Sequence, residues 1–130
     1  MKTIAAIRKT PSIYLSCWTG KEDMICDFAN DKREVMLIAQ ELLGAHIILA
    51  TYGFEDYSGS AFVLYEKAGV FYEVTGGHCS CYGLEGQWKP EATTLNAIAH
   101  RIVKGSLGHA DYETSPFAEE LANAIGMLED

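Results

Sequence analysis

The sequence is poor in positively charged residues. Its 130 residues hold 10 Lys and Arg against 18 Asp and Glu, so the formal net charge is −8. Proteins that bind nucleic acid directly usually present a basic face, because contacts with phosphate supply much of their affinity. The composition therefore argues against direct binding of nucleic acid. It favours a well-solvated surface or a protein partner with a basic surface.

Long apolar segments and a disulfide framework are also missing. No apolar run approaches the roughly 18 residues that a membrane-spanning helix needs. Arg8 and Lys9 interrupt the apolar start before the core of a signal peptide is complete. We therefore expect a cytoplasmic protein with no membrane partner, in which the four cysteines are reduced thiols. The length corresponds to a single domain over residues 1–130.

Several short segments have the composition of β-strands. Residues 13–18 and 46–52 are rich in β-branched and aromatic side chains, and a polar loop over 53–60 is expected to follow the second of them. The segments 61–66 and 70–74 are joined by a short turn that contains glycine, which is typical of a β-hairpin. These strands predict a small antiparallel sheet of three or four strands.

Three helices are expected around this sheet. Asp31 has the position of an N-cap, and apolar residues at helical spacing predict a helix over 32–43. A second helix begins at Thr93 or Thr94, and a terminal helix begins behind Ser115-Pro116. Helices and strands in this order predict an α+β fold with the helices packed on one face of the sheet.

The segment 76–88 gathers unusual residues and is the first candidate for a site. It contains four of the 12 glycines and two of the four cysteines. Together with the loop over 53–60 it carries aromatic and acidic residues, a mixture that is typical of contact surfaces between proteins. Such aromatic residues can instead close the edge of a core. The candidate contact residues are Phe54, Glu55, Asp56, Tyr57, His78, Tyr82, Glu85 and Trp88.

A metal or thiol centre is the alternative for the same segment. His78, Cys79 and Cys81 are zinc-type ligands, and Cys17 or Cys26 would complete a set. The C-x-C spacing differs from the usual C-x₂₋₄-C of zinc sites, and reduced core cysteines explain the same residues. A thiol nucleophile would need a histidine base within reach. The sequence therefore assigns no catalytic residue, no metal ligand and no cofactor.

Part of the chain resembles a family of small proteins found mostly in tailed phages and prophages, for which no activity is settled. The matching residues lie in the segments 49–52, 57–64, 72–74, 78–88 and 90–94. The most specific part is His78-Cys79-Ser80-Cys81-Tyr82-Gly83-Leu84. Residues 1–45 and 106–130 carry no such resemblance.

The resemblance implies a phage-encoded accessory protein that acts in the cytoplasm of the bacterial host. By analogy with other small acidic phage proteins, we expect it to bind and inhibit a host defence or nucleic-acid-handling complex. An acidic surface suits that role, because it can occupy a basic groove that normally holds phosphate.

Overall fold

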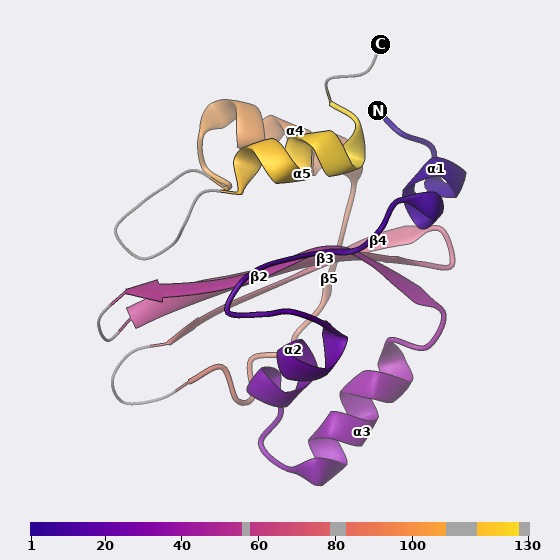
Figure 1. The fold of residues 1–130 in the computed structure, drawn as a ribbon. Helices are drawn as coiled ribbons and strands as arrows, with labels where there is room; N and C mark the ends of the chain where they lie inside the picture. Colours follow the sequence, from indigo (N-terminus) through magenta and orange to yellow (C-terminus); the bar gives the residue numbers. More distant parts are fainter. Residues whose placement is uncertain (56–57, 79–82, 109–116, 128–130) are drawn as a thin grey trace.

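The computed structural model describes residues 1–55, 58–78, 83–108 and 117–127, apart from the side chains of Phe54, Glu55 and Ser58. The described chain forms a five-stranded sheet that lies between two layers of helices (Figure 1). The strands are β1 (Ile13–Ser16), β2 (Ala45–Glu55), β3 (Ser58–Lys67), β4 (Val70–His78) and β5 (Glu91–Thr93). The helices are α1 (Ile4–Lys9), α2 (Lys21–Phe28), α3 (Lys32–Glu41), α4 (Leu95–Lys104) and α5 (Ala118–Ile125).

The sheet confirms the predicted α+β class, but it is mixed and larger than expected. Its strand order is β1-β2-β3-β4-β5. β1 pairs with β2 in parallel, and the other neighbours are antiparallel. The helices α2 and α3 form the connection from β1 to β2, because parallel neighbours need a long crossover. The strand β5 has only three residues, too few for a pattern to predict it.

The predicted hairpin is confirmed, and its neighbour is longer than the sequence indicated. β3 and β4 are joined by Ala68 and Gly69, both with positive φ, 53° and 85°. The predicted polar loop over 53–60 was wrong for its described residues, because β2 continues to Glu55 and β3 begins at Ser58, directly opposite it; residues 56–57 lie outside the described part of the chain. The glycines and serines that suggested a loop are instead paired between β2 and β3.

The prediction that all helices pack on one face of the sheet was wrong. α2 and α3 cover one face, and α1, α4 and α5 cover the other (Figure 1). The physical reason lies in β3, where consecutive residues from Ala61 to Tyr65 are all buried. Side chains of a strand alternate between faces, so a continuous buried run requires cover on both. A register shift between Ile47 and Leu49 adds to this by directing Ile48 and Leu49 to the same face.

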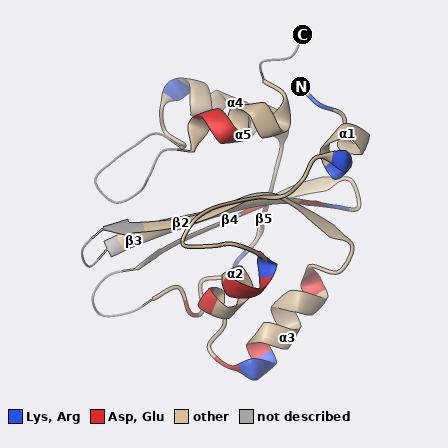
Figure 2. Cartoon of the chain, viewed as in Figure 1, with Lys and Arg blue, Asp and Glu red and all other residues tan. Residues whose placement is uncertain are grey.

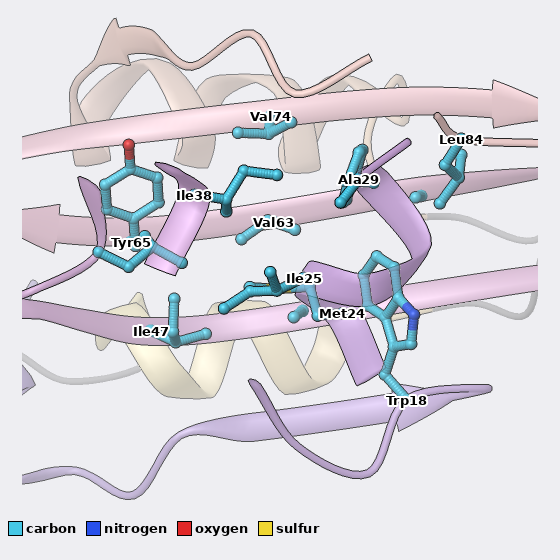
Figure 3. Close-up of a cluster of buried hydrophobic side chains, with 14 residues drawn as sticks. Trp18, Met24, Ile25, Ala29, Ile38, Ile47, Val63, Tyr65, Val74 and Leu84 are labelled. Carbon is cyan, nitrogen blue, oxygen red and sulfur yellow. The ribbon is translucent and has the colours of Figure 1, made fainter. Parts of the chain in front are cut away.

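The two faces have different cores. The aromatic face, as we call the side covered by α2 and α3, buries Trp18, Phe28 and Tyr65 together with Val63 and Val74 (Figure 3). The aliphatic face, covered by α1, α4 and α5, is built mainly from Ile and Leu. Its fully or nearly fully buried residues include Ile7, Leu49, Leu64, Ile98, Leu121 and Ile125.

Helix caps explain where the predicted helices begin and end. Asp31 accepts a hydrogen bond from the Glu34 amide at 2.9 Å, and α3 ends two residues earlier than expected. Thr94 caps α4 at the Ala97 amide at 3.1 Å. The proposed cap at 115–116 lies outside the described residues, and α5 begins at Ala118. The helices α1 and α2 were missed, because six and eight residues give little periodicity.

Candidate binding site

The sequence-predicted contact residues that the structure describes are spread along the sheet. His78 lies where β2 and β4 end, whereas Trp88 stacks on Tyr65, which pairs with Ile47 and Tyr72 toward the opposite end of these strands. Tyr52 precedes the end of β2, and His78 is the last residue of β4. The segment 83–88 returns along the sheet and brings Leu84 and Trp88 to the aromatic face, with Glu85 exposed between them. Phe54 and Glu55 lie in β2, although their side chains are not described. Asp56, Tyr57 and Tyr82 lie outside the described residues, as do the weak metal candidates Cys79 and Cys81.

Gly76 creates the space into which the returning segment packs. In the sheet register it lies next to Ala61, which in turn pairs with Tyr52. A Cβ atom on Gly76 would stand 3.0 Å from Leu84 Cδ2 and 3.2 Å from both Gln87 Oε1 and Phe28 Cε1. The absence of a side chain therefore lets Leu84 and Phe28 fill the core against the strand itself.

Gln87 fastens this segment to the edge of β4. Its Oε1 accepts a hydrogen bond from the Gly77 amide at 2.8 Å, and its Nε2 donates to the Gly77 carbonyl at 2.7 Å. The same Nε2 donates to the Gly83 carbonyl at 2.7 Å. The side-chain amide thus takes the place of a neighbouring strand at Gly77, where the edge would otherwise lack a partner. Gly86 N completes the attachment with a bond to the Phe28 carbonyl at 3.2 Å.

Tyr52 and His78 form the polar centre of this end of the sheet. The Tyr52 hydroxyl lies 2.6 Å from His78 Nδ1, and the two rings meet edge to face. Burial, reinforced by the negative charge of Asp27 and by Cys17 and Glu85, raises the pKa of Tyr52 to about 12. The hydroxyl is therefore protonated at neutral pH and can donate to Nδ1 of a neutral histidine ring.

A series of aromatic rings connects this pair to the opposite side of the aromatic face. Trp18 lies 5.3 Å from Tyr52 and 5.8 Å from Phe28, measured between ring centroids. Phe28 lies 5.2 Å from Trp88, which stacks on Tyr65 at 6.1 Å and an angle of 7°. Edge-to-face and offset contacts of this kind stabilise a fixed arrangement of rings.

Carboxylates fix both indole rings of this series. Trp18 Nε1 donates to Asp27 Oδ2 at 2.7 Å, and Trp88 Nε1 donates to Glu41 Oε2 at 2.9 Å. Burial and the neighbouring Glu41 raise the pKa of Tyr65 well above its ordinary value. Trp18, Asp27 and Glu41 could not be assigned to this site from the sequence, because only the tertiary fold brings them together on the aromatic face.

Trp88 also borders a groove on the surface. The groove has a volume of about 350 Å³ and lies between α3 and the segment 86–88. Leu37 from α3 lines the opposite wall, with Arg33, Glu34 and Glu41 beside it. Trp88 is half-buried and Leu37 is 49% exposed, so both apolar side chains are accessible to a partner. Glu85, three residues before Trp88, adds an exposed carboxylate to the same segment.

The described residues do not assemble the metal centre considered from the sequence. Within the described ranges, no three His, Cys, Asp or Glu side chains are grouped as metal ligands. Cys17 and Cys26 are exposed. Although Cys17 is exposed as a residue, partial desolvation of its sulfur, together with the nearby Asp27, raises its pKa, which disfavours the reactive thiolate. A centre that uses Cys79 or Cys81 stays a prediction, because both residues lie outside the described part of the chain.

These features define a class: an α+β protein with a mixed five-stranded sheet, two helical layers and a series of aromatic rings that reaches the surface at Trp88, beside Glu41. Comparisons with models of protein families, with curated proteins and with solved structures found no match. Among the described helices, none is long and apolar enough to span a membrane.

Proposed function

We propose that the chain is a non-enzymatic binding protein, encoded by a phage or prophage, that acts in the cytoplasm of the bacterial host. Its partner is a host defence or nucleic-acid-handling protein that presents a basic surface. The contact surface comprises the segments 54–60 and 76–88, together with the part of α3 that borders Trp88. The resemblance to phage proteins supports the phage origin, and the aromatic and acidic residues of the surface support binding to a basic protein.

The observation that carries the proposal is the way Trp88 is held. Phe28 and Tyr65 support its ring, Glu41 fixes its Nε1, and the groove toward Leu37 leaves part of the ring accessible. A tryptophan that is already ordered loses little entropy on binding, and it offers a large apolar area with one polar atom. Residues of this kind dominate the binding energy of many interfaces.

The charge around Trp88 supports a basic partner. Residues 21–41, which include both helices of the aromatic face, hold three Lys and Arg against six Asp and Glu. Glu85 adds an exposed carboxylate at the end of the sheet. The three helices on the opposite face together hold four Lys and Arg against two Glu, both of them on α5 (Figure 2). Complementary potentials of this kind accelerate encounter and select the partner.

Affinity capture tests the proposal directly. The tagged protein is incubated with lysate from a candidate bacterial host under reducing conditions, with and without nuclease, and bound proteins are identified by mass spectrometry. We expect one stoichiometric partner that survives nuclease treatment. Binding that disappears with nuclease would contradict the proposal, because the acidic chain should not require nucleic acid as a bridge.

Matched variants then locate the surface. Glu85→Lys, at the proposed surface, should weaken the complex at least tenfold, whereas Glu119→Lys, an exposed position on α5, should leave its affinity unchanged. Trp88→Ala and Tyr82→Ala should also weaken it, with circular dichroism as the check that the fold survives. Equal affinity for Glu85→Lys, Trp88→Ala and the wild type would contradict this placement.

The metal or thiol alternative has its own test. Metal analysis of the purified protein, together with alkylation of its thiols, examines His78, Cys79 and Cys81 as a group. A binding role predicts that chelators leave the melting temperature unchanged and that alkylated protein still captures its partner. Stoichiometric zinc, or an activity that alkylation abolishes, would instead favour the metal or thiol centre.

A further inference from the structure

The outward face of α3 is unusually apolar for a surface helix. Met36 is 72% exposed and Leu37 is 49% exposed, and Leu43, just past the helix end, is 69% exposed. These three are half of the six large hydrophobic residues that are exposed in the described part of the chain. Single exposed apolar residues are ordinary, whereas a group on one helix marks an interaction surface.

The charges on the same helix are separated by sign. Lys32 and Arg33 lie in its first turn and Glu41 is its last residue (Figure 2). Leu37 lies midway, four residues from both Arg33 and Glu41, so the three share one side of the helix. In the described ranges, neither Lys32 nor Arg33 belongs to an ion pair.

The acidic residues near the start of α3 are already engaged. Asp31 accepts the Glu34 amide as the N-cap. Glu34 is only partly exposed, and its carboxylate accepts hydrogen bonds from the backbone and side chain of Asn30. Glu41 also accepts a hydrogen bond, from Trp88 Nε1, but it is exposed, as Arg33 and Leu37 are. The side that these three residues share is therefore basic near its start, apolar in the middle and acidic at its end.

A surface with this order is complementary to itself. We propose that α3 packs antiparallel against α3 of a second copy, with the two-fold axis close to Met36 and Leu37. In that arrangement each Arg33 faces Glu41 of the other copy, and the apolar side chains pack against each other at the centre. Arg33 and Glu41 are eight residues apart, about 12 Å along the helix, so both ion pairs form in one register.

The antiparallel arrangement is favoured over a parallel one by the same charges. Two parallel copies would place Arg33 beside Arg33 and Glu41 beside Glu41, which repels at both ends. An isologous contact also closes after two copies, so it gives a discrete dimer and not a filament. The inference does not depend on the proposed function, because it concerns the chain without any host partner. Leu37 and Glu41 also border the proposed contact surface, so a second copy and a host partner would compete for this side of α3.

Sedimentation equilibrium of the purified protein over a range of concentrations tests the dimer. We expect a monomer–dimer equilibrium that weakens as salt concentration rises, because salt screens the exposed ion pairs. Leu37→Glu and Met36→Glu should each raise the dissociation constant about tenfold or more. Val103→Glu is the matched control, since Val103 is 77% exposed on α4, in the opposite helical layer. A protein that stays monomeric at every concentration would overturn the proposal, as would a dimer that Leu37→Glu leaves intact.

Charge reversal identifies the orientation. Arg33→Glu and Glu41→Arg should each weaken self-association, because each places like charges opposite one another at both ends of the contact. When the two variants are mixed, every facing pair is again opposite in sign, so a heterodimer should form at close to the wild-type affinity. Circular dichroism verifies that each variant is folded, since Glu41 also accepts from Trp88. Failure of the folded mixture to associate would overturn the antiparallel pairing.

Discussion

On the aromatic face, rings carry polar atoms that bond to side chains nearby, whereas on the aliphatic face ion pairs attach helices to the sheet. Trp18 and Trp88 donate to Asp27 and Glu41, respectively. On the other side, Phe62 and Phe117 stack at 5.4 Å without any polar atom in their rings. The same sheet therefore supports two cores with different chemistry.

The ion pairs differ between the two faces as well. Both ion pairs among the described residues belong to the aliphatic face: Arg8–Glu66 at 2.7 Å and Arg101–Glu73 at 2.6 Å. Glu66 is 1% exposed, and it also accepts a hydrogen bond from the Gly69 amide at 2.9 Å. These pairs attach α1 and α4 to the sheet, which is a structural role.

This difference between the faces favours the aromatic face as the place where a partner binds. Directional hydrogen bonds and ring contacts fix side chains in one orientation, and on the aromatic face they continue to the surface at Trp88. The aliphatic face depends mostly on apolar burial, which is not directional and places fewer demands on geometry. A fixed aromatic side chain at the surface is prepared for binding, and we therefore place the proposed contact surface at the edge of the aromatic face.

Removing one phenylalanine from each face gives the largest expected effect. Phe28 is fully buried and Phe117 is 7% exposed, so Phe28→Ala and Phe117→Ala should each lower the free energy of unfolding by about 4 kcal/mol. Both tryptophans of the chain lie on the aromatic face, and both touch Phe28. Native tryptophan emission should therefore change in Phe28→Ala and stay constant in Phe117→Ala. An equal change in the two variants would show that the faces are coupled.

The sequence predicted the elements whose signals are local. The β3–β4 hairpin, α3 with its Asp31 cap and α4 with its Thr94 cap are confirmed close to their expected bounds. Each depends on residues a few positions apart. The missed elements, α1, α2 and β5, are short, and tertiary contacts stabilise them, for example the bond from Arg8 on α1 to Glu66 on β3.

The candidate site was predicted in part. The segment 76–88 and the position of Trp88 follow from composition, and Gly76 is indeed required for close packing. Trp18 and Asp27 could not be placed, because the parallel pairing of β1 with β2 brings them to the site and no local pattern encodes it. Because local patterns do not encode which face of a sheet a helix covers, the helices were also expected on one face only.

A side chain at Gly76 would point into the packed core of the aromatic face. Gly76→Ala should lower the free energy of unfolding by about 3 kcal/mol, because the new methyl group meets Leu84, Gln87 and Phe28 at 3.0–3.2 Å. Gly77→Ala, one residue later, faces only the Gly59 carbonyl at 3.6 Å, an ordinary contact, and should be close to neutral. Urea unfolding of both variants measures the difference, and equal losses would contradict the tight packing at Gly76.

Acid should act on the aliphatic face through Glu66. Hydrogen bonding to Arg8, then the Gly69 amide and the charge of Arg8, hold the pKa of Glu66 below its ordinary value. The stabilisation that the Glu66 carboxylate gives to the fold is therefore complete above the pKa of an unfolded glutamate, roughly 4.3. It is lost as pH falls through the lower pKa of the folded state. Glu66→Gln should cost about 2 kcal/mol at neutral pH, and the gap to the wild type should close on acidification. Urea unfolding across pH measures this gap, with Glu91→Gln at an exposed position of β5 as the control. A gap that stays constant with pH would contradict the role of Glu66.

Alkali should act on the aromatic face, through a smaller effect. The pKa of Tyr52 in the folded protein is raised to about 12. The stabilisation that its protonated hydroxyl gives to the fold is therefore complete below the pKa of an unfolded tyrosine, roughly 10, and is lost as pH rises through about 12. Tyr52→Phe removes the bond to His78 and should cost about 1 kcal/mol at neutral pH. Above pH 10 the variant should lose stability less steeply than the wild type, although Tyr14 and Tyr65, whose pKa values are also raised by burial, still contribute. Urea unfolding from neutral to alkaline pH gives both slopes. Identical slopes would mean that the Tyr52–His78 pair does not stabilise the aromatic face, and the contrast between the two faces would then depend on the tryptophans alone.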